Sequence, residues 1–150
     1  MKLRITRTQA VVVAVAISTL PLFAINAAAQ IAVSSNDGKV VLNNGIVNVP
    51  SNPVDDTVTV INLGVSPPKV IAEFKAPSSV TGPPQNVAVA PDESFALVAA
   101  TMKLDPADPK KLVPDNRLSV IDLKANPPAV IATLEAGLGP SGTAINPDGT

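Results

Sequence analysis

The sequence contains no histidine, cysteine, tryptophan or tyrosine, and only three phenylalanines. Without histidine and cysteine, the usual protein ligands of zinc, copper and haem are missing, and the remaining carboxylates and carbonyls suit only hard cations. The same absence removes the commonest general base and every serine–histidine or cysteine–histidine catalytic arrangement. We therefore expect no catalytic constellation, no cofactor and no metal site among these residues.

Charged residues are few and nearly balanced, with 11 Lys and Arg against 12 Asp and Glu. Three of the basic residues, Lys2, Arg4 and Arg7, lie at the start of the chain, and without them eight basic residues face twelve acidic ones. A mildly acidic domain repels phosphate groups, so nucleic acid and anionic membrane surfaces are not expected as partners.

The N-terminus has the order of a secretory signal peptide. Basic residues are followed by an apolar run from Ala10 to Ala24 and by small residues at Ala27–Ala29. The run is shorter than the roughly 20 uninterrupted apolar residues of a transmembrane helix, and Pro21 interrupts it. We predict a signal peptide over residues 1–29, with cleavage before Gln30, and a product in the periplasm or outside the cell.

The remainder of the chain repeats itself. Val60-Ile61-Asn62-Leu63 returns 60 residues later as Val120-Ile121-Asp122-Leu123, and each copy is followed by a double proline and a further apolar run. A second motif occurs three times, with its aspartates at Asp37, Asp92 and Asp148. Short β-branched runs between turn residues, with frequent prolines and no sustained helical period, indicate strands. We therefore expect an all-β protein.

Each repeat is expected to hold four antiparallel strands, named A to D. The second motif supplies the tight turn between A and B, because Pro-Asp-Gly suits a chain reversal. The predicted strands lie at 31–34, 40–43, 57–63 and 70–74 in the first repeat, at 86–90, 95–100, 117–123 and 130–134 in the second, and at 143–146 in a third. The predicted domain spans 30–150, with units at about 30–80 and 86–136 and the start of another at 143–150.

The order G-x-A-V-x-P-D-G, a strand, V-x-V-I-D and V-x-A-T-I resembles the YVTN-type β-propeller repeat of exported bacterial and archaeal proteins. The resemblance implies a partial β-propeller, in which each repeat is a four-stranded blade. The Tyr-Val-Thr-Asn signature of strand B is absent, and the spacing of 55 to 60 residues exceeds the usual about 40–50. The predicted strands are too few to close a ring, so we expect an N-terminal fragment of a larger propeller or an assembly of several chains.

The antiparallel order puts the B–C and D–A connections at the same end of every repeat. These connections are long, whereas the A–B and C–D turns at the other end are short. Binding surfaces are commonly built from long loops on a rigid scaffold. We therefore expect the ligand face at the end formed by residues 44–56, 75–85, 101–116 and 135–142.

Four features at that end resemble sites. Gly137–Gly142 fits G-x-G-x-x-G, but a strand is expected after it, where a dinucleotide site needs a helix. Asp105, Asp108 and Asp115 alternate with lysines and prolines at no calcium-loop spacing, which favours a solvated loop over calcium binding.

The other two features lie where the C strands begin. Asp55-Asp56 opens the first C strand and Asp115-Asn116 the second, and turn capping explains both. Arg117 follows at the same rim, either as a surface charge or as a contact to a carboxylate or oxyanion.

The leading hypothesis is an exported, noncatalytic binding or scaffold module that holds an unknown protein, polymer or small-molecule ligand. The resemblance also implies two alternatives: a lactonase-like hydrolase, or a periplasmic redox subunit, whose active residues would lie in further C-terminal blades. The fold alone does not choose between these functions.

Overall fold

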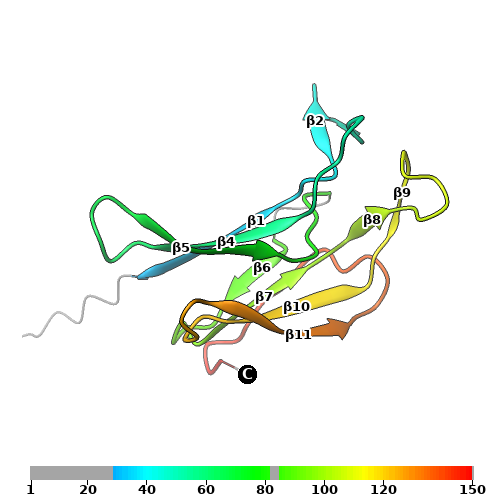
Figure 1. Ribbon diagram of the computed structural model, residues 1–150. Helices are drawn as coiled ribbons and strands as arrows, with labels where there is room; N and C mark the ends of the chain where they lie inside the picture. Colours follow the sequence, from blue (N-terminus) through cyan, green and yellow to red (C-terminus); the bar gives the residue numbers. More distant parts are fainter. Residues whose placement is uncertain (1–28, 82–84, 150) are drawn as a thin grey trace, which may run out of the picture.

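The computed structural model describes residues 29–81 and 85–149, and these residues are all-β, with eleven strands and no helix (Figure 1). The part described accordingly holds no helix that could cross a membrane. The predicted signal peptide lies outside the described residues, apart from Ala29. The strands are β1 (Ile31–Asn36), β2 (Val41–Asn43), β3 (Ile46–Asn48), β4 (Thr57–Asn62), β5 (Lys69–Lys75), β6 (Val87–Val89), β7 (Phe95–Ala99), β8 (Met102–Leu104), β9 (Leu112–Pro114), β10 (Arg117–Asp122) and β11 (Ala129–Glu135).

The second repeat forms a four-stranded antiparallel sheet in the order β11-β10-β7-β6. Strands that follow one another along the chain pair with one another, which confirms the four strands predicted for this repeat to within two residues at each end. Asp92 stabilises the turn between β6 and β7, because its carboxylate accepts the Ser94 N–H at 3.0 Å. The turn residues therefore act as the sequence predicts here.

The first repeat differs from its prediction. β1 pairs directly with β4, and β5 completes a three-stranded sheet in the order β1-β4-β5. Ser35 lies opposite Val58 as Ala99 lies opposite Leu118 in the other sheet, so β1 takes the place of the second strand of a repeat. The placement of strand A at 31–34 and strand B at 40–43 is therefore wrong.

A hairpin follows the strand in this position in both repeats: β2 pairs only with β3, and β8 only with β9. Asn44 and Gly45 both have positive φ, 50° and 79°, as the two-residue turn of a hairpin requires. The two hairpins project from the same end of the molecule (Figure 1). The predicted loops 44–56 and 101–116 thus contain regular structure.

The core lies between the two sheets, which pack face to face. Val58, Val60, Val98 and Ile121 are fully buried there, and each alternates along its strand with a residue on the opposite face. The pairing of β4 with β5 shifts register between Val60 and Ile61, and that of β10 with β11 shifts 60 residues later, between Val120 and Ile121. The other core residues are Ala76, Ala96 and Leu123, with Ile31, Val33, Ala72, Phe74, Val87, Val89 and Val130 packed against them.

The outer face of the three-stranded sheet is polar. Asn36 donates through Nδ2 to Thr57 Oγ1 at 3.1 Å and to Thr59 Oγ1 at 3.0 Å, while Ser34 donates to Asn36 and Thr59 to Glu73. In the four-stranded sheet, the repeat places apolar Val98 where this sheet has Ser34. We call the hydrogen-bonded set the polar row: Ser34, Asn36, Thr57, Thr59 and Glu73.

The predicted third strand A, at 143–146, is not formed as a strand. Its neighbour Gly142 makes an isolated parallel bridge to Gln85, and the Thr143 N–H donates to the Gln85 carbonyl at 2.8 Å. The turn after it resembles the β6–β7 turn, since the Gly149 N–H donates to the Asn146 carbonyl at 2.9 Å. The segment therefore has the predicted turn but not the predicted strand.

Candidate functional site

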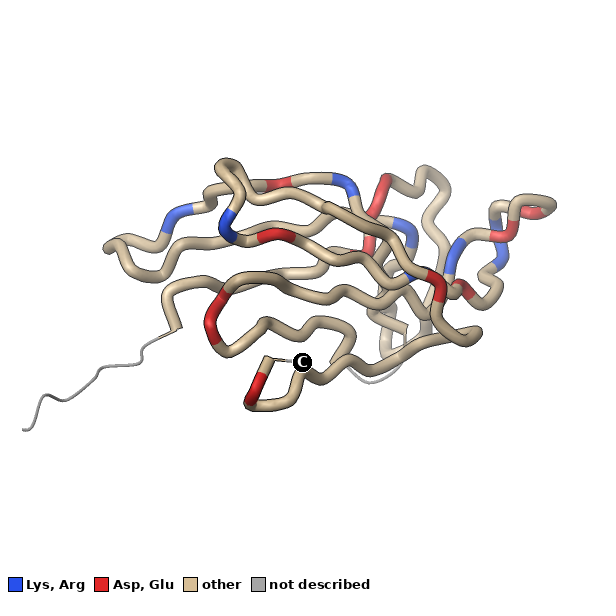
Figure 2. The backbone as a smooth tube through the Cα atoms, turned by 90° about the horizontal axis from the view of Figure 1, so that it is seen from below, with Lys and Arg blue, Asp and Glu red and all other residues tan. Residues whose placement is uncertain are grey.

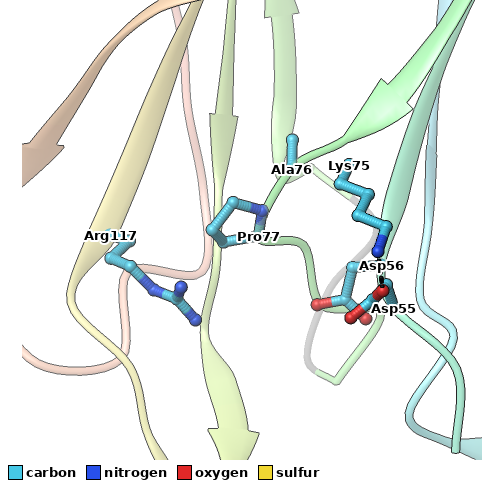
Figure 3. Close-up of a pocket in the computed structure, with 6 residues that line it drawn as sticks. All are labelled: Asp55, Asp56, Lys75, Ala76, Pro77 and Arg117. Carbon is cyan, nitrogen blue, oxygen red and sulfur yellow. Dashed lines mark ion pairs between the residues drawn. The ribbon is translucent and has the colours of Figure 1, made fainter.

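A cleft opens between the two sheets, at the end from which the hairpins project. Two adjoining hollows of about 250 and 260 Å³ share Asp55, Asp56 and Arg117 among their lining residues. Figure 3 shows Arg117 of β10 on one side and Asp55 and Asp56 on the other, with Pro77 between them. We call this the inter-sheet cleft; its other lining residues are Lys39, Val54, Lys75, Ala76, Lys103 and Leu104.

Beside the cleft, Lys39 is buried with two carboxylates. Its Nζ donates to Asp37 Oδ1 at 3.1 Å, to Asp56 Oδ2 at 2.9 Å and to the Ser78 carbonyl. Side-chain exposure is 6% for Lys39, 1% for Asp37 and 12% for Asp56. The carboxylates also accept backbone N–H groups, from Ser78 at 3.2 Å and from Val80 at 3.0 Å. This cluster joins the segments after β1, before β4 and after β5.

The sequence analysis places Asp37 in a turn at the opposite end, equivalent to Asp92 and Asp148, and this is wrong. Asp37 lies in the buried cluster at the cleft, because β1 runs as the second strand of its repeat and ends here. Asp56 is also more than a turn cap, since it accepts Lys39. Asp55, by contrast, is exposed and forms an ion pair with the equally exposed Lys75.

On the other side of the cleft, Arg117 binds Asp115. Arg117 donates through Nε at 2.9 Å and through Nη2 at 2.6 Å to Asp115 Oδ2, and the Asp115 side chain is 0% exposed. Burial alone raises the pKa of Asp115, but the hydrogen bonds from Arg117 and from the Asn116 N–H outweigh it and leave this pKa below its usual value. Arg117 remains 42% exposed, so its guanidinium faces the cleft as well as Asp115. Its carboxylate partner is therefore intramolecular.

The three aspartates considered for calcium are not brought together. Asp105 and Asp108 lie in the β8–β9 loop, where they accept the N–H groups of Ala107 and Lys110. Asp115 is buried against Arg117. Residues 29–81 and 85–149 contain no group of three or more His, Cys, Asp and Glu side chains that could hold a metal ion. Figure 2 shows lysine and aspartate of opposite sign along the β8–β9 hairpin.

The glycine-rich segment Gly137–Gly142 is a structural turn. Gly139 has a φ of 66°, and its N–H donates to the Asp115 carbonyl at 2.8 Å. The Thr101 hydroxyl donates to the Pro140 carbonyl at 2.8 Å. An extended segment follows it where a dinucleotide site requires a helix. The turn therefore holds the backbone around Asp115.

Sequence reasoning missed Lys39 and Ser78. A lysine directly before the apolar run at Val40 signals burial, and a buried lysine needs carboxylate partners. Ser78 carries no such signal, because its role depends on the chain returning to Lys39 after β5. The cleft can offer cationic donors and carboxylate acceptors to a polar ligand.

No family model, curated protein or solved structure matches this chain. Membership of the YVTN-type family stays a prediction.

Proposed function

We propose that this chain is an exported β-propeller repeat protein that acts as a binding or scaffold module, with its ligand at the inter-sheet cleft. The single observation that carries the proposal is the position of the cleft. It lies at the end of the long connections, and Asp56, Lys75 and Arg117 reach it from three different connections. Rigid sheets that present convergent polar groups from several loops are a common way to build a binding surface.

The repeat geometry supports treating the two sheets as neighbouring blades of a partial propeller. Both sheets are antiparallel, both carry a hairpin at the same point, and both have a register shift at positions 60 residues apart. Their faces pack against each other through a shared apolar core. Radial repetition of packed sheets is the principle of a propeller.

The charges of the cleft favour a ligand that both accepts and donates hydrogen bonds. Arg117 and Lys103 suit carboxylate or carbonyl groups, whereas Asp55 and Asp56 suit amide or hydroxyl donors. A polypeptide segment or a polyhydroxyl polymer carries both kinds of group. The hydrolase and redox alternatives remain expectations from the family resemblance alone.

Site-specific crosslinking tests the proposal. A photoreactive residue is placed at Lys75 or Lys103, on the cleft, in the full chain produced in a bacterial host that exports it. Matched variants carry the same residue at Lys69 or Lys124, near the C–D turns at the other end. We expect covalent adducts from the two cleft positions and few from the two control positions. Equal labelling at both ends, or adducts from the control positions alone, would contradict the proposed ligand face.

A further inference from the structure

Glu93 stands in the β6–β7 turn with a left-handed backbone, at a φ of 55°. The matching position of the later Pro-Asp-Gly turn is Gly149, with a φ of 78°. Glycine adopts this conformation freely, whereas a residue with a side chain is disfavoured in it. The turn therefore retains a glutamate against the local backbone preference, which directs attention to its side chain.

The Glu93 carboxylate binds the backbone at the start of β1. Its Oε1 accepts the Gln30 N–H at 2.7 Å and the Ile31 N–H at 3.1 Å, across more than 60 residues of sequence. The Gln30 carbonyl in turn accepts the Leu63 N–H at 2.7 Å. Gln30 is thus held from both sides by contacts that do not involve any residue before it.

Gln30 is also the residue that the proposed signal-peptide cleavage would expose. Hydrolysis of the Ala29–Gln30 bond adds one water: Ala29 keeps the new carboxylate, and the Gln30 nitrogen becomes an α-ammonium group. In the structure this nitrogen is an amide that already lies 2.7 Å from a carboxylate oxygen. We propose that Glu93 is the receptor for the α-ammonium of Gln30, so that processing creates an ion pair between the new N-terminus and the neighbouring sheet. This inference rests on the export proposed above.

The surroundings favour a positive charge at this place. Ala29, Gln30, Asp92 and Glu93 line one hollow of about 490 Å³, which leaves room for the cleaved end. Asp92 and Glu93 are its charged groups, and Lys124 acts on Asp92 from the next turn. Both carboxylates stabilise a cation at the Gln30 nitrogen, and Lys124 opposes them only in part.

The ion pair has a chemical consequence for an N-terminal glutamine. Such a residue cyclises when its neutral α-amine attacks its own side-chain Cδ, forming the lactam C–N bond and releasing ammonia. Binding to Glu93 keeps the amine protonated and removes its nucleophilic lone pair. A pKa raised by one unit lowers the fraction of neutral amine about tenfold. We therefore expect slow cyclisation in the wild type and an increase of about tenfold in Glu93→Gln.

The experiment uses the full chain exported with its own leader, with Glu135→Gln as a control that removes an exposed carboxylate elsewhere. Mass spectrometry gives the N-terminal residue and the rate of ammonia loss. The thermal midpoint is measured between pH 6 and pH 10 for the processed chain and for the unprocessed chain made in the cytoplasm. A raised α-ammonium pKa stabilises the fold below the ordinary value of about 7.7, and this contribution is lost as the pH rises through the raised value.

We expect Glu93→Gln to lower the midpoint of the processed chain at pH 6 and to have a smaller effect at pH 10. The unprocessed chain should lack that pH dependence, because an amide does not titrate in this range. Equal effects at every pH, or unchanged cyclisation, would overturn the proposal. If Glu93→Gln does not fold, the α-amine of wild-type Gln30 is titrated by NMR, and an ordinary or lower pKa refutes capture.

Failure of export and failure of capture can be distinguished. A mature N-terminus other than Gln30 refutes the predicted cleavage. Capture is then measured on the full chain with residues 26–29 replaced by a factor Xa recognition sequence, which is cut directly before Gln30.

Discussion

Replacing Lys39 with methionine provides the sharpest test of the buried cluster. The substitution keeps a similar side-chain volume and removes the cation between Asp37 and Asp56, whose side chains are 1% and 12% exposed. Removing one partner of a buried ion pair costs about 3–5 kcal/mol, because the remaining charge stays buried without compensation. Against a total stability of about 5–15 kcal/mol for a domain, that is a large loss.

The assay is urea unfolding followed by far-UV circular dichroism, since the chain has no tryptophan or tyrosine for fluorescence. With a typical slope of about 2 kcal/mol per molar, a loss of about 4 kcal/mol moves the midpoint by about 2 M. Lys75→Met is the matched control, because Lys75 pairs with Asp55 in solvent at 79% and 64% exposure. Its midpoint should stay near that of the wild type.

The reasoning on Lys39 is refuted if Lys39→Met unfolds at the wild-type midpoint. It is also refuted if the two methionine variants lose stability equally. A triple variant that adds Asp37→Asn and Asp56→Asn should recover part of the loss, because the buried carboxylate charges are then gone.

Two further predictions concern other residues around the cleft. The lowered pKa of Asp115 stabilises the fold above the unfolded value of about 3.9, and that contribution is lost as the pH falls through the folded value. Arg117→Gln should therefore move acid unfolding to higher pH in a circular dichroism titration, and an unchanged acid midpoint would contradict this. A Cβ at Gly38 would lie 2.6 Å from the Asp55 carbonyl oxygen, so Gly38→Ala should cost about 1–3 kcal/mol in urea unfolding. Gly137→Ala, with nothing within 4 Å, is its control, and equal losses would argue against the steric reason.

The second repeat could be predicted from the sequence because its local signals agree with its pairing. Pro91-Asp92 forms a turn, and Phe95–Ala99 alternates between a face toward the core and a face away from it. The first repeat could not, because Asp37-Gly38 has the composition of the same turn but lies at the opposite end of a strand. Only the cross-strand pairing of Ser35 with Val58 distinguishes the two cases, and pairing between distant residues is not visible in a local motif.

The candidate site was predictable in its location but not in its interactions. Antiparallel order placed Asp55, Asp56 and Arg117 at one end, and the structure brings them to one cleft. The hairpin turn at Asn44-Gly45 had a sequence signal, Asn-Gly between apolar pairs, that the repeat analysis passed over. The contact of Lys39 with Ser78 had none, since it depends on how the chain crosses from one sheet to the next.

The polar row gives the two sides of this stack of sheets different adhesive properties. A surface that meets Ser34, Asn36 and Thr59 finds hydroxyl and amide groups already engaged with one another, and little hydrocarbon to remove from water. If the sheets belong to a ring, the contact on this side is its seam. Opening the ring there would expose the least apolar area. Such a molecule would breathe at one defined joint rather than equally at every sheet.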